Sequence, residues 1–367
     1  MTRRSGLVEI AFGVTAAMIL CGCAAVATTG AGSAASETPN AGSAASGAAA
    51  KDLRLGYFAN VTHAPALIGV QQGILQEELG DTTLSTQIFN AGPAAIEALS
   101  AGAIDAAYIG PNPSINTFIK SGGQSAHIVA GVTSGGAALV VREGIDSAAD
   151  LKGATLATPQ LGNTQDVALR SWLADEGYAT DTTGGGDVHI TPTENAQALT
   201  LFQNGQLDGA WLPEPWASRL IIEGGAHVLV DEADLWKDGA FPTTVLLVSS
   251  EFLDKYPATV AALVAGNEES IAWLNANPDA DDTAINEQLS VDAGKPLNEE
   301  VLARALEHVK FSSDPVAAAF PKLLKAGVDT GVAKSGDING LFALDILNEL
   351  RAANKGEAVS DAKLGGE

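Results

Sequence analysis

NGQLDGAWLPEPW, residues 204–216, repeats the pattern of an earlier stretch, AGAIDAAYIGPNP, residues 101–113. Each stretch has a Gly, then an Asp three residues later, an aromatic residue three further on, and a Pro shortly after. The equivalent pairs are Gly102 and Gly205, Asp105 and Asp208, and Tyr108 and Trp211. The pattern predicts a helix that stops at the Gly, a strand entered at the Asp, and a second helix begun near the Pro. The recurrence indicates that one α/β unit is used twice.

Strand and helix patterns alternate in two successive segments around these stretches, with short connections. The predicted strands are 53–58, 83–89, 105–109, 127–132, 137–141, 154–158, 187–192, 208–212, 227–230 and 243–248. The predicted helices between them are 64–73, 92–101, 113–120, 164–176, 195–204 and 215–223. After residue 248 only helices are expected, at 257–275, 281–292, 298–309, 315–326 and 338–352. This order predicts an α/β fold with two lobes, mostly parallel sheets and a helical C-terminal part.

The N-terminal residues have the features of a secretory signal. Arg3 and Arg4 precede an apolar run at 10–20, which is too short to span a membrane. The run ends in LCGC, which resembles a bacterial lipobox, so we expect a signal peptide at 1–22 and a lipid on Cys23. Cleavage without a lipid is the alternative. The Ala-, Gly- and Ser-rich residues 23–50 then form a flexible tether.

Composition excludes several functional classes. The net charge of the 367-residue chain is −24, which argues against binding nucleic acid or anionic lipid directly. Its 2 cysteines are Cys21 and Cys23, so the body has no disulfide and no thiolate metal site. The 5 histidines show no metal-ligand spacing, and no metal or cofactor is expected. Because no GxSxG, Walker A or HExxH motif occurs, we do not expect an enzyme.

Small polar residues follow the predicted strands. The junctions 60–63, 90–93, 110–114, 161–164, 192–195 and 212–215 are rich in Asn, Thr, Ser and Gly and contain no Lys or Arg. Ligands of parallel α/β sheets bind at the carboxyl ends of the strands, where helix N-termini attract anions. These junctions therefore predict a site for a small anion, held by amides and hydroxyls. Ordinary helix capping is the alternative explanation.

Four stretches carry a family resemblance: 53–75, 89–115, 150–173 and 205–221. They resemble the nitrate/sulfonate/taurine branch of bacterial solute-binding proteins, the extracytoplasmic receptors of ABC importers. The resemblance implies a type II periplasmic-binding-protein fold, in which two lobes joined by crossing segments close on a ligand. The crossings would lie near 139–142 and 241–247. Lobe 1 would be 51–140 plus 242–353, lobe 2 would be 141–241, and 354–367 would be a disordered tail.

The same resemblance implies which residues bind the ligand. Its motifs map onto Asn60, Thr62, Gly92, Pro111, Asn112, Thr133, Ser134, Gly162, Asn163, Thr164, Trp211 and Glu214. His63 either donates to the anion or caps its helix. Glu214 would repel an anion unless the ligand also carries an amine, as taurine does; alternatively it points away. We expect Arg170 to form a surface pair.

The implied function is a monomeric, lipid-anchored receptor on the outer face of the cell membrane. It would capture a small anionic or zwitterionic organosulfonate, such as an aliphatic sulfonate or taurine, and deliver it to an ABC permease and its ATPase. Nitrate, a pyrimidine or thiamine precursor, or another small nutrient are alternative ligands. A ligand-sensing domain is an alternative role. A pyrimidine synthase of the same fold would consume an active-site His. His63 is the only histidine expected near the cleft.

Overall fold

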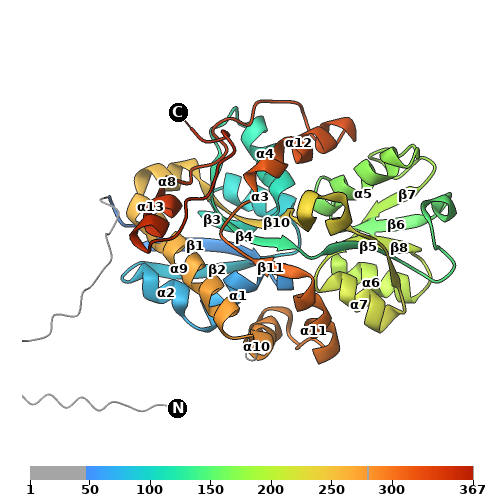
Figure 1. Cartoon of the computed structure of the whole chain (residues 1–367), viewed down its shortest axis with the longest axis horizontal. Coiled ribbons are helices and arrows are strands. Elements are labelled where there is room, and N and C mark those ends of the chain that lie inside the picture. Colours follow the sequence, from blue (N-terminus) through green and yellow to red (C-terminus); the bar gives the residue numbers. More distant parts are fainter. Residues whose placement is uncertain (1–46, 279–280, 367) are drawn as a thin grey trace, which may run out of the picture. The chain divides into compact units, whose positions relative to one another are not determined.

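Two separate β-sheets organise the residues that the structure, a computed structural model, describes: 47–278 and 281–366 (Figure 1). All of these residues belong to one structural unit. The predicted signal peptide, Cys23 and most of the predicted tether lie outside the described residues.

The first sheet has the strand order β11-β4-β10-β3-β1-β2. Its strands are β1 (Asp52–Phe58), β2 (Thr83–Phe89), β3 (Ala106–Ile109), β4 (Ala126–Gly135), β10 (Pro242–Ser249) and β11 (Val309–Phe311). The second sheet has the order β7-β6-β8-β5-β9. Its strands are β5 (Ala137–Val141), β6 (Thr155–Thr158), β7 (His189–Pro192), β8 (Gly209–Pro213) and β9 (His227–Asp231).

Both sheets are mixed, which corrects the expectation of mostly parallel sheets. β1 is parallel to β2 and β3, and β6 is parallel to β7 and β8. β10 and β5, however, pair antiparallel with both of their neighbours. The reason is that the chain crosses between the sheets on β4–β5 and again before β10, and each crossing adds a strand of opposite direction.

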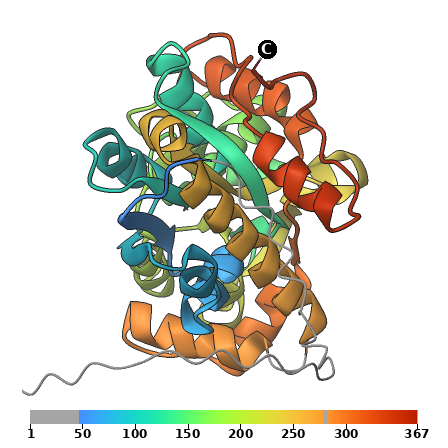
Figure 2. The same ribbon diagram turned by 90° about the vertical axis from the view of Figure 1, so that its left-hand side faces the viewer.

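Helices cover the faces of both sheets. Around the first sheet lie α1 (Ala64–Gln71), α2 (Ile74–Leu79), α3 (Gly92–Ser100), α4 (Pro111–Lys120), α8 (Ser250–Lys255), α9 (Pro257–Ala276) and α13 (Asp345–Ala353). Figure 2 shows α9 and α13, which contact each other, beside this sheet. Around the second lie α5 (Thr164–Asp175), α6 (Asn195–Gln203) and α7 (Trp216–Gly224). From the C-terminal part, α11 (Glu299–Glu307) contacts α7, α12 (Phe320–Asp329) contacts α5, and α10 (Asp281–Ala293) contacts α1.

The repeated sequence unit forms equivalent structure in both sheets. Gly102 and Gly205 follow the ends of α3 and α6 in the left-handed region, with φ of 67° and 69°. Asp105 accepts the backbone N–H of Arg54 at 2.9 Å and its guanidinium, at the entry to β3. Asp208 accepts the backbone N–H of Thr155 at 2.7 Å and the guanidinium of Arg142 at 2.8 Å, at the entry to β8. Each Asp thus stands at the entry of a central strand, as the sequence predicted, and its carboxylate also fastens that strand to a neighbouring one.

The first crossing lies earlier than expected. Gly135 and Gly136, with φ of 81° and 75°, separate β4 in the first sheet from β5 in the second. A Cβ on Gly135 would stand 2.6 Å from the carbonyl oxygen of His308, so no other residue fits there without a shift. The second crossing ends where β10 begins at Pro242. We therefore define lobe 1 as residues 47–135 and 242–366, and lobe 2 as residues 136–241.

The C-terminal part differs from the prediction in two ways. β11 pairs with β4, so helices are not the only elements after residue 248. The predicted disordered tail is attached within its described residues: the carboxamide of Asn348 accepts the N–H of Val359 at 2.7 Å and donates to its carbonyl at 3.1 Å. Leu364 likewise accepts from the N–H of Gly340 at 2.9 Å. The polar composition of the tail predicted disorder because composition does not reveal hydrogen bonds such as those between Asn348 and Val359.

Two features are absent from the described residues, 47–278 and 281–366. None of their helices is long and apolar enough to cross a membrane. They also contain no cluster of three or more His, Cys, Asp or Glu that could hold a metal ion.

Candidate ligand-binding site

The N-termini of helices from both lobes meet between the two sheets. α3 and α4 arrive from lobe 1 and α5 and α6 from lobe 2, each directly after a strand. Their N-cap residues are Ala91, Gly110, Asn163 and Glu194, and none of these makes a side-chain capping hydrogen bond. The helix-capping alternative therefore does not account for these junctions. The first-turn N–H groups of a helix lack intrahelical acceptors, so these ends can donate to an anion. Pro93 in α3 and Pro111 and Pro113 in α4 have no N–H, so α3 and α4 offer fewer donors than α5 and α6.

A small cavity of about 20 Å³ lies among these ends. Its walls consist of Phe58, Asn60, Thr62, His63, Asn90, Gly110, Pro159, Asn163, Thr164, Gln165, Asn195, Pro213 and Thr243. No Lys, Arg, Asp or Glu is among these residues. Both lobes contribute, and the volume has room for about one water-sized group, so the lobes stand close together in this structure.

Two glycines permit this close approach. A Cβ on Gly110 would stand 2.5 Å from the hydroxyl oxygen of Thr164, in the other lobe. A Cβ on Gly92 would overlap the ring of Pro113 and stand 3.2 Å from the side-chain oxygen of Asn163. Gly92 is thus a predicted site residue whose place is at the junction of the lobes rather than on the cavity wall.

The cavity has polar groups without partners. The hydroxyl oxygen of Thr164 and the side-chain oxygen of Asn195 are buried and accept or donate no hydrogen bond in the described part of the chain. Since a buried polar group without a partner costs about 1–3 kcal/mol, such atoms mark places where a ligand can supply the missing bond. Asn60 and Asn163, by contrast, are already engaged with Trp216 at 2.8 Å and Gln165 at 2.9 Å.

His63 is a neutral member of the cavity wall. Its ring stacks on Phe58 with centroids 4.4 Å apart, and its Nδ1 accepts the backbone N–H of Phe58 at 3.4 Å. Burial lowers the pKa of His63 to about 3, so the ring carries no charge at neutral pH. With Nδ1 as the acceptor, the ring proton is on Nε2. Of the two roles left open by the sequence, hydrogen-bond donation toward the cavity fits this geometry, whereas His63 makes no side-chain capping bond.

Several predicted site residues do not line the cavity. The side chain of Asn112 donates to the carbonyl of Leu323 at 3.2 Å, and Trp211 donates to Glu232 at 2.8 Å inside lobe 2. The others outside the wall are Gly92, Pro111, Thr133, Ser134, Gly162 and Glu214. The sequence singled out loops beside the cavity but does not indicate which residues of each loop face it.

Glu214 points away from the cavity and connects the lobes. Its carboxylate accepts the Nη1 of Arg304 at 2.9 Å and the N–H of Ser218 at 3.0 Å. Its side chain is 2% exposed, and burial raises its pKa despite the opposing hydrogen bonds from Ser218. Arg304 lies on α11 of lobe 1, which packs against α7 of lobe 2. The partner of this carboxylate is therefore a protein arginine and not a ligand amine.

Five polar or small wall residues were missing from the predicted set: Asn90, Gly110, Gln165, Asn195 and Thr243. The first four belong to, or directly follow, strand-to-helix junctions that the sequence singles out, so including every junction residue would have found most of them. Thr243 lies in β10, directly after the end of the second crossing, and is not part of a strand-to-helix junction.

A wider opening of about 490 Å³ adjoins the cavity and shares Asn60, Asn90 and Asn195 with it. Charged residues of both lobes border this opening: Glu194, Arg219, Glu223, Asp292 and Lys295. Arg219 pairs with Glu223 at 2.9 Å, and Asn90 donates across the lobes to Glu194 at 3.0 Å. The wider opening can thus hold a part of a ligand larger than the cavity admits.

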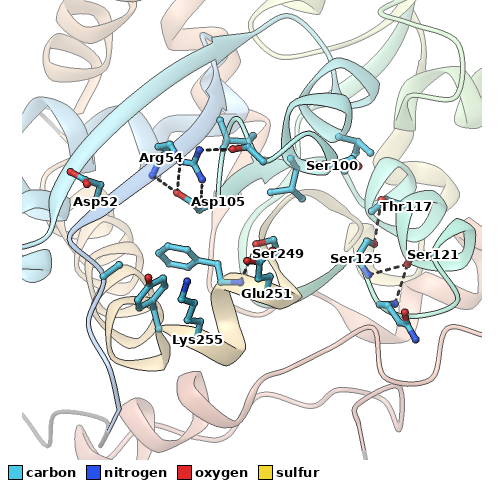
Figure 3. Close-up of a pocket in the computed structure, with 18 of the residues that line it drawn as sticks. Asp52, Arg54, Ser100, Asp105, Thr117, Ser121, Ser125, Ser249, Glu251 and Lys255 are labelled. Atoms are coloured by element: carbon cyan, nitrogen blue, oxygen red, sulfur yellow. Dashed lines mark hydrogen bonds and ion pairs between the residues drawn. The ribbon is translucent and has the colours of Figure 1, made fainter.

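A larger depression, of about 1190 Å³, lies at the opposite edge of the first sheet (Figure 3). It is bordered by the amino ends of β1 and β3, where Arg54 pairs with Asp105. Helix C-termini, including those of α3 and α4 at Ser100 and Lys120, lie at this edge, and their carbonyls disfavour anions. Size alone therefore does not make it the ligand site, and the smaller cavity has the better chemistry.

Two lobes with a polar cavity between them form the architecture of a solute-binding protein. The model of the NMT1-like family matches residues 46–287, and the chain belongs to this family. A Brucella abortus protein with the provisional name of a binding protein is 26% identical over 268 residues, 71% of this chain and 80% of that protein. An Escherichia coli K12 protein, provisionally named an aliphatic sulfonates-binding protein, is 27% identical over 225 residues, 60% of this chain and 66% of that protein.

Solved structures show the same fold. The alkanesulfonate-binding protein SsuA of Xanthomonas axonopodis pv. citri, bound to MOPS, matches with a TM-score of 0.65 and 22% identity over 78% of this chain and 96% of that chain. The periplasmic nitrate-binding protein NrtA of Synechocystis PCC 6803 matches with a TM-score of 0.71 and 17% identity over 83% and 89%. The fold class is therefore the two-lobed periplasmic-binding fold that the sequence predicted.

Proposed function

We propose that this protein captures a small organosulfonate outside the cytoplasm and delivers it to an ABC permease and its ATPase. The observation that carries the proposal is the convergence of four helix N-termini without side-chain caps on one cavity, where the hydroxyl of Thr164 has no partner. A sulfonate offers three oxygens that accept hydrogen bonds and one delocalised negative charge. Neutral amides and hydroxyls match such a group without a competing lysine or arginine.

The two connected spaces support an anion that carries an organic tail. The head group would meet the N-termini in the cavity, and the tail would extend past Asn60, Asn90 and Asn195 into the wider opening. Because the cavity holds only about 20 Å³, a sulfonate requires the lobes to separate slightly from their present approach. Glu194 and Asp292 border the wider opening and would favour a tail bearing an ammonium group, as in taurine.

Nitrate is the second candidate, favoured by the small size of the cavity. It has three acceptor oxygens and no tail, and it would leave the wider opening to solvent. Similarity to proteins named for sulfonate binding and for nitrate binding supports both candidates.

We further propose that Cys23 carries the lipid anchor and that the residues between it and lobe 1 form the tether to the outer face of the membrane. Ala50, which the sequence assigned to the tether, is buried in lobe 1 and donates its N–H to Thr259 at 2.8 Å. A monomer is sufficient for this role, because both lobes of a single chain form the cavity.

Isothermal titration calorimetry with the full-length protein tests the proposal. The panel contains ethanesulfonate, taurine, nitrate, sulfate, a pyrimidine and a neutral sulfone of similar shape. Binding of a sulfonate with sub-millimolar affinity, and a higher melting temperature in its presence, is the expected result. Binding of only the uncharged compounds would contradict it, and binding of nitrate alone would select the second candidate.

A further inference from the structure

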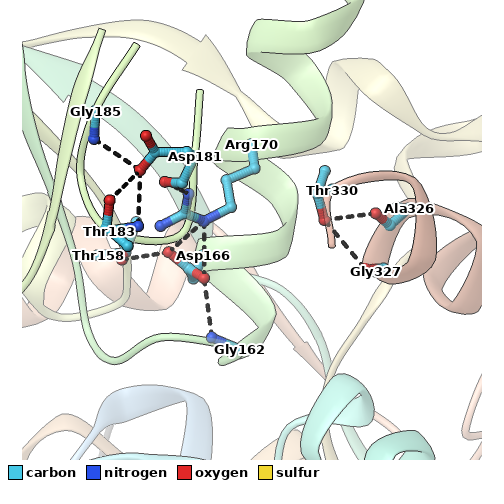
Figure 4. Close-up of polar contacts among 10 residues, drawn as sticks. All are labelled: Thr158, Gly162, Asp166, Arg170, Asp181, Thr183, Gly185, Ala326, Gly327 and Thr330. Carbon is cyan, nitrogen blue, oxygen red and sulfur yellow. Dashed lines mark hydrogen bonds and ion pairs between the residues drawn. The ribbon is translucent and has the colours of Figure 1, made fainter. Parts of the chain in front are cut away.

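A fully buried ion pair lies beneath the lobe 2 loop that forms part of the cavity (Figure 4). Asp166 and Arg170, one turn apart on α5, are 3.1 Å apart, and both side chains are 0% exposed. Neither lines the cavity, although the preceding residues Asn163, Thr164 and Gln165 do. The expectation that Arg170 forms a surface pair is therefore wrong.

Asp166 fixes the conformation of this loop. One carboxylate oxygen accepts the backbone N–H of Gly162 at 2.9 Å, and the other accepts the hydroxyl of Thr158 at 2.9 Å. Gly162 has a φ of 77°, the left-handed region, so the chain turns sharply between the end of β6 and the first residue of α5. The carboxylate thereby connects the strand end, the loop and the helix.

The position of this carboxylate creates an electrostatic problem. Asp166 lies in the first turn of α5, the helix end that is to attract the anion. An uncompensated negative charge a few ångströms from the ligand would repel it strongly in a buried site. Arg170 removes this repulsion, because its Nε donates to both oxygens of Asp166 at 3.1 Å.

Arg170 is also fastened on its other side. Its Nη1 donates to the carbonyl of Asp181 at 2.7 Å, whereas its Nη2 is buried without a partner. Asp181 belongs to an exposed turn, where its own carboxylate accepts the N–H groups of Thr183 and Gly185 at 2.7 and 2.9 Å. An arginine that keeps a buried donor unsatisfied is costly, which argues that its charge, and not its packing, is what this position requires.

Other charged groups near the pair already have hydrogen-bond or ion-pair partners of their own. The carboxylate of Asp181 has a lowered pKa, caused first by the hydrogen bond from Gly185 and to a smaller extent by Arg170. On α12, which packs against α5, Lys325 pairs with Asp329. Figure 4 shows Thr330, at the end of α12, directed back to the carbonyls of Ala326 and Gly327.

We propose that Asp166 and Arg170 are positioning residues for ligand binding: Asp166 sets the loop from Gly162 to Thr164, and Arg170 cancels its charge so that the end of α5 still attracts an anion. The inference rests on the proposed function, since it concerns the affinity for an anionic ligand.

Three variants test the inference by calorimetry with ethanesulfonate and with nitrate. R170M leaves the carboxylate uncompensated, and we expect affinity for the anion to fall by about tenfold or more. The double variant D166N/R170M has no charge, and its Asn keeps an acceptor for Gly162, so affinity should return to within about threefold of wild type. R170K keeps the charge and should also stay within about threefold of wild type.

The outcomes separate this inference from the proposed function. A purely structural pair would make the double variant bind as weakly as R170M, and that result would overturn the inference, as would unchanged affinity in R170M. If R170M does not fold, checked by circular dichroism, weak binding by folded D166N/R170M overturns it equally. Wild-type protein that binds no anion of the panel would overturn the proposed function itself.

Discussion

Gly110 and Thr164 approach each other from opposite lobes so closely that a Cβ on Gly110 would stand 2.5 Å from the hydroxyl oxygen of Thr164. Gly110 is the N-cap of α4, and Thr164 is the first residue of α5. The two helix ends that we assign to anion binding can therefore face each other at this distance only if one residue has no side chain.

This contact predicts that Gly110→Ala weakens ligand binding by about tenfold, because the added methyl group displaces the hydroxyl of Thr164 from its place on the cavity wall. The melting temperature without ligand should change little, since each lobe keeps its own core. Calorimetry measures the affinity. The matched control is Thr164→Ala: in that background the same Gly110→Ala change should cost much less. Equal costs in both backgrounds would contradict the contact.

Glu214→Gln should weaken aminosulfonates and plain alkanesulfonates by the same factor. The carboxylate pairs with Arg304 at 2.9 Å and does not line the cavity, so the charge of a ligand amine does not reach it. We expect a loss of unfolding free energy of about 1–3 kcal/mol from the weakened ion pair, measured by urea denaturation. A selective loss of taurine affinity would show instead that Glu214 binds the amine of the ligand.

Ligand affinity should be constant between about pH 5 and pH 8, because no cavity residue changes charge there. Burial lowers the pKa of His63 to about 3, so this ring stays neutral over the range. His63 affects stability in the opposite direction from a histidine that gains an ion pair on folding. Below about pH 6.5 the unfolded chain takes up a proton on His63 that the folded protein does not bind. The stability of the folded protein therefore falls as the pH falls toward 3. Calorimetry across the range checks the first statement. A decrease in affinity centred near the pKa of a free histidine would contradict it.

Glu232→Gln should stabilise the protein at pH 8 and flatten its pH–stability curve. Burial raises the pKa of Glu232 to about 7 from 4.5, so the folded state binds the extra proton between these values. The contribution of Glu232 to stability is therefore full below about pH 4.5 and decreases by about 3 kcal/mol as the pH rises to about 7. Gln can still accept from the indole of Trp211. Urea denaturation at several pH values is the measurement, with a Gln substitution at the exposed Glu307 as control. Identical curves for wild type and Glu232→Gln would refute the assignment.

The fold followed from short-range patterns in the sequence. The duplicated Gly and Asp residues fix a helix end and a strand entry by local backbone bonds, so Asp105 and Asp208 were placed correctly. β11 was missed because three residues give too little pattern, and its partner β4 lies far away in the chain. The first crossing was placed a few residues late because β5, Ala137–Val141, is apolar and buried throughout, so its sequence does not mark where the chain leaves the first sheet.

The candidate site was predicted in part for a similar reason. Strand-to-helix junctions are local features, and Asn60, Thr62, His63, Asn163 and Thr164 do line the cavity. Which way a junction side chain points depends on distant partners: Trp211 donates to Glu232, and Glu214 pairs with Arg304, ninety residues away. Those partners lie outside every motif.

A crystal structure grown with ethanesulfonate, with the sulfur located by its anomalous signal, tests the central claim most directly. The account predicts the sulfonate between the lobes, with its oxygens within hydrogen-bond distance of the hydroxyl of Thr164 and of first-turn N–H groups of α5 and α4. A sulfur atom in the depression beside Arg54 and Lys120 would contradict the account. A cavity between the lobes that holds no ligand at saturating concentration would contradict it as well.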